Sequence, residues 1–104
     1  MSSPQLFLRE KDKSRLLALL DLHVPDAAVW VYGSRVKGQA HDGSDLDIVL
    51  RSRDLLPIPR VQIHRLREAL SESSIPILID VEDWAKLPAS FHAEILNQYV
   101  VLKV

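Results

Sequence analysis

The chain contains no cysteine among its 104 residues. Disulfide bonds and metal sites built on thiolates are therefore excluded, and cysteine usage leaves the redox compartment open. No run approaches the ~18 consecutive apolar residues that span a bilayer, so we expect no membrane segment. The first residues carry no basic segment followed by a long apolar one, so no signal peptide is expected and the cytoplasm is the expected location.

The sequence also lacks an excess of charge of one sign. Thirteen basic and fourteen acidic residues give a formal net charge of −1. This balance argues against a protein that binds nucleic acid through a broad basic face, and we expect no direct nucleic-acid partner. A small anionic ligand remains compatible with it, because such a ligand needs only local positive charge. The length suits one domain with a single hydrophobic core.

Two short polar motifs each border an apolar run. Gly33-Ser34 follows the run 27–32, and after ten further residues Asp45-Leu46-Asp47 precedes the run 48–50. Asp45 and Asp47 stand at positions i and i+2 of an expected strand, so both carboxylates project from the same face. Two carboxylates side by side repel each other unless a cation lies between them. The second motif therefore indicates a cation site.

The Gly-Ser motif indicates an anion site next to it. Gly33 lets the backbone approach a ligand closely and can adopt a positive φ. Ser34 is expected to begin a short helix, and the free N–H groups of a helix start bind anions; the alternative role of Ser34 is that of a helix N-cap, and the two roles are compatible. Arg35 and Lys37 either supply positive charge to this site or are ordinary surface cations. An anion site beside two carboxylates is what a metal-bound nucleoside triphosphate requires, so the pattern predicts phosphoryl chemistry.

Hydrophobic periodicity and chain breakers predict alternating helices and strands. The expected elements are helix 10–22, strand 27–32, short helix 34–39, strand 45–51, helix 61–72, strand 75–81, helix 88–98 and a strand at 99–104. We therefore expect an α/β (α+β) fold, in which helices flank a small mixed sheet of three to four strands. Residues 1–9 are expected to form a flexible arm and residues 10–104 a single domain. Trp30 and Trp84 are expected in the core rather than stacked on a base.

A third carboxylate is expected to join the first two. Asp80 ends the apolar part of the expected strand 75–81, and it reaches the same site if that strand pairs beside the strand of Asp45. Three carboxylates would hold two Mg²⁺ ions that align an attacking hydroxyl with the α-phosphate. Glu82 and Asp83 are alternatives for the third position, although they look like the start of a turn or helix.

The Gly-Ser-x10-Asp-x-Asp pattern resembles the nucleotidyltransferase superfamily that includes DNA polymerase beta and kanamycin nucleotidyltransferase. Over residues ~10–104 the chain resembles its minimal, MNT-type branch, which implies the nucleotidyltransferase fold. The resemblance implies that Asp45 and Asp47 are metal ligands and that Asp80 is a third ligand and the base toward the acceptor hydroxyl. From the residues themselves we expect a nucleotide-binding side made of Gly33, Ser34, Arg35, Lys37 and Ser44. In it, Ser44 is expected to bond backbone or the Asp47 carboxylate, and so to orient rather than react.

The resemblance also implies a function. Members of this branch lack the second domain with which longer relatives bind the acceptor, are commonly antitoxins paired with a HEPN-domain ribonuclease, and in some cases transfer AMP from ATP to a tyrosine of that toxin. We therefore expect an ATP- and Mg²⁺-dependent adenylyltransferase in a hetero-oligomer with a HEPN toxin. The alternatives are a non-catalytic antitoxin that blocks its partner sterically and a nucleotidyltransferase that modifies an aminoglycoside-like small molecule.

Overall fold

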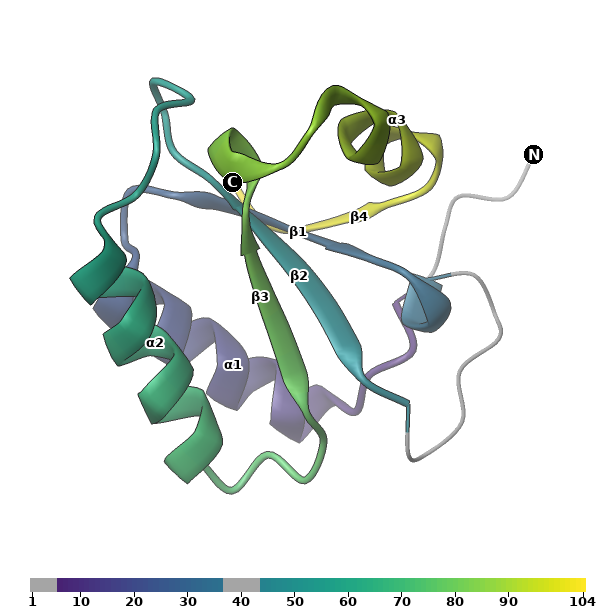
Figure 1. The fold of residues 1–104 in the computed structure, drawn as a ribbon. Coiled ribbons are helices and arrows are strands. Elements are labelled where there is room, and N and C mark those ends of the chain that lie inside the picture. Colours follow the sequence, from purple (N-terminus) through teal and green to yellow (C-terminus); the bar gives the residue numbers. More distant parts are fainter. Residues whose placement is uncertain (1–5, 37–43) are drawn as a thin grey trace.

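In the computed structural model, which describes residues 6–36 and 44–104, four strands form one mixed sheet between two helical layers (Figure 1). The strand order is β3-β2-β1-β4; β2 is parallel to β3, and β1 is antiparallel to β2 and β4. This is the mixed sheet expected from the sequence. The elements in chain order are α1 (Glu10–His23), β1 (Ala28–Tyr32), the 3-10 turn η1 (Ser34–Val36), β2 (Leu46–Arg51), α2 (Arg60–Glu72), β3 (Ile79–Asp83), the 3-10 turn η2 (Trp84–Lys86), α3 (Ala89–Asn97) and β4 (Val100–Lys103).

The main core lies between the sheet and the layer formed by α1 and α2 (Figure 1). Alternate strand residues point into it because side chains alternate between the two faces of a strand. The central strands and the two helices contribute fully buried side chains, among them Leu16, Leu20, Val29, Val31, Leu46, Ile48, Leu50 and Leu66. Within the described ranges, no helix combines the length and the apolar character that crossing a bilayer requires.

A smaller aromatic core covers part of the opposite face, beneath α3 and η2. The Arg51 guanidinium lies between two indole rings, 4.1 Å from the centre of Trp30 and 4.6 Å from that of Trp84. Trp30 also stacks on Tyr99 at 4.2 Å, and Trp84 stacks on His92 at 3.8 Å. Both tryptophans therefore pack within this core, as expected.

Strand β3 lies further along the chain than the sequence indicates. The expected strand 75–81 is wrong in its bounds, because the strand runs from Ile79 to Asp83. The apolar residues before it fill the core without joining the ladder: Ile75 is buried and Ile77 packs partly against the same core, next to Pro76, which has no N–H to donate. Asp80 is consequently near the beginning of the strand rather than near its end.

The segment before α1 packs on the domain. Leu6 and Leu8 pack against the main core, and the Phe7 N–H donates a 2.9 Å hydrogen bond to the Arg35 carbonyl. Residues 6–9 of the expected flexible arm are therefore part of the folded unit, whereas residues 1–5 lie outside the described part. Of the expected helix 34–39, the described residues form only the single turn Ser34–Val36.

Candidate active site

The three predicted carboxylates lie at one end of the sheet. Asp47 is the cross-strand partner of Tyr32 in β1 and of Asp80 in β3. Residues in register on neighbouring strands project from the same face, so the Asp47 and Asp80 carboxylates share a face. Asp45 is exposed and directly precedes the first residue of β2, Leu46. The strand pairing that the sequence required for a shared site is thus present.

Negative charge is concentrated at this end of the sheet. The pKa of Asp47 is raised above its ordinary value by burial first, then by the charges of Asp80, Asp45 and Glu82. The pKa of the Tyr32 hydroxyl is also raised, by burial and then by the neighbouring carboxylates. Mutual repulsion of this kind is what a bound divalent cation relieves.

The carboxylates are not yet gathered around one point. Within residues 6–36 and 44–104, no three His, Asp or Glu side chains are already arranged to hold a metal ion. Asp45 and Asp80 are both exposed, so their side chains are free of the packing that would fix a rotamer. A metal ion would therefore have to draw these side chains toward Asp47.

Gly33 lies directly against the Asp47 carboxylate. The φ of Gly33 is +82°. A Cβ added to Gly33 would overlap the Asp47 carboxylate and would lie only 3.2 Å from the Asp47 Cγ. Only glycine fulfils both requirements without strain. Ser34 follows in a single 3-10 turn, closed by a 3.1 Å hydrogen bond from the Val36 N–H to the Gly33 carbonyl. An anion held here would depend on individual N–H groups and the Ser34 hydroxyl, because one turn has little helix dipole.

Arg35 connects backbone segments beside this turn. Arg35 is buried, with only 8% of the residue exposed. Nη1 donates to the Phe7 carbonyl at 2.8 Å, and Nε and Nη2 donate to the Ser44 carbonyl at 3.0 and 2.8 Å. Ser44 thus contacts Arg35 through its backbone carbonyl, while a direct contact of Arg35 with nucleotide stays a prediction. Lys37, the other predicted cation, lies outside the described residues.

The structure separates the alternatives for the third carboxylate. Asp83 is 3% exposed and accepts hydrogen bonds from the Ile58 N–H at 2.8 Å and the Ala85 N–H at 3.2 Å. Its side chain leaves β3 on the face opposite to that of Asp80, so Asp83 is structural. Glu82 shares the face of Asp80 and pairs with Val49, which lies two residues beyond Asp47 in β2. Asp80 therefore fits the third position best, with Glu82 as the nearest alternative.

Tyr32 is a site residue that the sequence analysis did not identify. It pairs with Asp47, and its ring meets Phe91 edge-on at 5.9 Å. The signal was its position directly before Gly33 at the end of an apolar strand, where alternation places its side chain on the Asp47 face.

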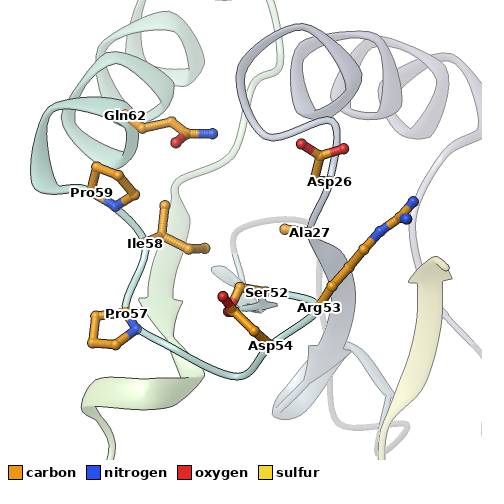
Figure 2. Close-up of a pocket in the computed structure, with 9 residues that line it drawn as sticks. All are labelled: Asp26, Ala27, Ser52, Arg53, Asp54, Pro57, Ile58, Pro59 and Gln62. Atoms are coloured by element: carbon orange, nitrogen blue, oxygen red, sulfur yellow. The ribbon is translucent and has the colours of Figure 1, made fainter.

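A separate hollow of about 300 Å³ lies at the other end of the sheet (Figure 2). It is lined by Asp26, Ala27, Ser52, Arg53, Asp54, Pro57, Ile58, Pro59 and Gln62. The Leu56 N–H and the Ser52 hydroxyl donate to the Asp54 carboxylate and lower its pKa below the usual range. Because β2 begins at the carboxylates and ends at this hollow, the hollow is separate from the candidate active site.

The chain belongs to the polymerase beta family of nucleotidyltransferases, whose family model matches residues 17–103. Over 102 residues it is 38% identical to the probable protein adenylyltransferase MntA of Haemophilus influenzae, and the match covers 98% of this chain and 88% of that protein.

Solved structures share the fold. A chain in the crystal structure of a toxin-antitoxin with AMP-PNP is similar with a TM-score of 0.71 at 21% identity, over 86% of this chain and 71% of that one. A chain in the complex of tri-AMPylated Shewanella oneidensis HEPN toxin with MNT antitoxin gives 0.69 at 18% identity, over 91% and 71% of the two chains.

Proposed function

We propose that this protein is a Mg²⁺-dependent adenylyltransferase that transfers AMP from ATP to a tyrosine of a HEPN-domain toxin and thereby acts as its antitoxin. The observation that carries the proposal is the alignment of Asp47 with Asp80 beside Gly33. It occurs in a member of the nucleotidyltransferase family that resembles a probable protein adenylyltransferase over nearly its whole length.

The donor set fits Mg²⁺. All candidate ligands are carboxylate oxygens, which this hard cation prefers, and their mutual repulsion favours a cation among them. Asp45, Asp47 and Asp80 would hold up to two ions. When bound, the ions would neutralise phosphate charge and favour in-line displacement at the α-phosphorus.

The protein side chains would accept the proton of the acceptor and bind the phosphates. Asp80 is exposed at the edge of the cluster and would accept the proton of the tyrosine hydroxyl. The tyrosine oxygen would then form the bond to the α-phosphorus while the bond to pyrophosphate breaks. Gly33 and the Ser34 hydroxyl would contact the β- and γ-phosphates, with Lys37 adding positive charge. Arg35 and Ser44 would contribute to the nucleotide side through the hydrogen bonds between them.

Related structures support the partner. One contains a toxin-antitoxin pair with AMP-PNP, and another contains a tri-AMPylated HEPN toxin bound to its MNT antitoxin. By analogy, the toxin would form a hetero-oligomer with this chain and deliver the acceptor tyrosine. With ATP as the donor, the proposed reaction belongs in the cytoplasm.

A second function is a non-catalytic antitoxin that blocks its partner sterically. The observation in its favour is that the carboxylates of the described residues are not converged on a metal position. Affinity purification from the native host, with the bound protein identified by mass spectrometry, would supply the partner. Incubating that partner with ATP labelled at the α-phosphate, with Mg²⁺ or with EDTA, then separates the two functions. Label that requires Mg²⁺ supports transfer, whereas neutralisation without label supports steric blocking.

A further inference from the structure

Arg35 joins two chain segments that are far apart in the sequence. Its guanidinium donates to the Phe7 carbonyl, 28 residues earlier, and to the Ser44 carbonyl, nine residues later. The Phe7 N–H returns a 2.9 Å hydrogen bond to the Arg35 carbonyl. The planar guanidinium presents its donors in a fixed fork, so the two segments are held in a defined relation.

One of these segments leads directly into the carboxylate cluster. Ser44, whose carbonyl takes two of the Arg35 hydrogen bonds, is the residue before Asp45. On the other side of Asp45, Leu46 is fully buried and its N–H donates to the Leu78 carbonyl at 2.9 Å. The exposed Asp45 side chain therefore extends from a backbone that is anchored both before and after it.

Arg35 is also part of the turn that follows Gly33, next to the Asp47 carboxylate. Arg35 follows Ser34 in η1, and the next carbonyl, that of Val36, accepts a 3.0 Å hydrogen bond from the Gln98 side chain. Arg35 thus links the Gly33-Ser34 turn to the backbone of Asp45. Its contact with Phe7 brings the segment before α1 into the same connection.

We propose that Arg35 is a positioning residue for nucleotidyl transfer, and that residues 6–8 are part of the active-site framework. Arg35 holds Asp45 at a fixed distance from the turn that contacts the phosphates. Small displacements of a catalytic group are costly, with about 100-fold in rate lost for a shift of ~1 Å. We call the hydrogen bonds from Arg35 to the Phe7 and Ser44 carbonyls the clamp. Its effect on catalysis rests on the proposed function, whereas the clamp itself does not.

This role differs from a direct contact between Arg35 and phosphate. A phosphate accepts either a lysine or an arginine as a positive partner. The clamp needs several donors in one plane, which a lysine ammonium cannot reproduce. Arg35→Lys therefore distinguishes the two roles, and Arg65→Lys, at an exposed position on α2, is the matched control.

Hydrogen exchange tests the clamp without any activity. In the ligand-free protein, Arg35→Lys should accelerate exchange of the Phe7 amide and of the amides at 44–46, while Arg65→Lys leaves them unchanged. Deleting residues 1–8 should accelerate exchange at 44–46 as well, and deleting only residues 1–5 should not. Unchanged exchange at 44–46 in both Arg35→Lys and the longer deletion would overturn the clamp.

Kinetics test the catalytic consequence. Arg35→Lys should lower kcat about 10- to 100-fold, with KM for ATP changed by less than about threefold. The deletion of residues 1–8 should also lower kcat, and the double variant should be no worse than the poorer single variant, because both changes break one connection. A raised KM with multiplicative losses in the double variant would instead assign Arg35 to phosphate. If the wild-type protein transfers nothing, the proposed function fails, and the exchange result still decides on the clamp.

Discussion

Asp47 of β2 and Asp80 of β3 are direct neighbours in a parallel strand pair, with both carboxylates on the same face of the sheet. Neighbouring strands lie ~4.8 Å apart, so two like charges are held close together by the backbone ladder itself. The fold therefore carries a local repulsion, and Asp45 and Glu82 add to it. This arrangement destabilises the metal-free protein and favours the binding of a cation.

Asp47→Asn should therefore stabilise the metal-free protein while abolishing transfer. Removing a like-charge cross-strand pair is worth ~0.2–1 kcal/mol, or about 1–6 °C in the melting temperature of a domain of this size. Protonation removes the same repulsion, so the advantage of the variant should shrink as the pH falls through the raised pKa of Asp47. Thermal unfolding in EDTA measures the effect.

Two controls accompany that experiment. Asp26→Asn, at an exposed position away from the cluster, should leave the melting temperature nearly unchanged. Mg²⁺ with ATP should raise the melting temperature of the wild-type protein but not that of Asp47→Asn. A variant that is less stable than the wild-type protein in EDTA would contradict the assignment of Asp47 to a repulsive cluster.

Asp80→Asn and Asp83→Asn should have opposite effects. Asp83 is buried and accepts two backbone hydrogen bonds, so its replacement should cost about 1–3 kcal/mol of stability. Asp80 is exposed and pairs with Asp47, so its replacement removes the same like-charge pair and should raise stability by ~0.2–1 kcal/mol while eliminating transfer. Chemical denaturation and a transfer assay on both variants check this. Normal transfer by Asp80→Asn would move the third position to Glu82.

Substitutions in the Gly33-Ser34 turn should separate folding from ligand contact. Gly33→Ala places a Cβ against the Asp47 carboxylate at a φ of +82°, which should cost about 1–3 kcal/mol. Ser34→Ala should lower transfer and leave stability within about 0.5 kcal/mol. Melting curves and transfer assays measure both. A large loss of stability in Ser34→Ala would mean that Ser34 chiefly caps the turn.

Local patterns predicted most of this fold. The spacing of Asp45 and Asp47 predicted that both carboxylates share a face, because side-chain alternation in a strand is a local property. The structure places Asp47 within β2 and Asp45 directly before it, so the shared face stays a prediction. Apolar periodicity likewise predicted α1 and α2 to within a residue or two of their observed bounds.

Properties that depend on tertiary contacts were not predictable. Ile75 and Ile77 look like strand residues, but they fill the core from a segment outside the ladder, and this displaces β3. The partners of Arg35 are carbonyls brought near by the fold, which no local pattern reveals. Asp83 was separable from Asp80 only once the strand's bounds and register were known.

The central claim is tested most directly by the mass of the partner protein. Incubating the purified HEPN partner with this protein and ATP·Mg²⁺ should add one or more units of ~329 Da to the partner, the mass of AMP minus water, as in-line displacement at the α-phosphorus requires. Asp80→Asn should still bind the partner and add no mass. If the wild-type protein neutralises the partner with no mass shift, and Asp80→Asn neutralises it equally well, the account is contradicted and the protein blocks its partner sterically.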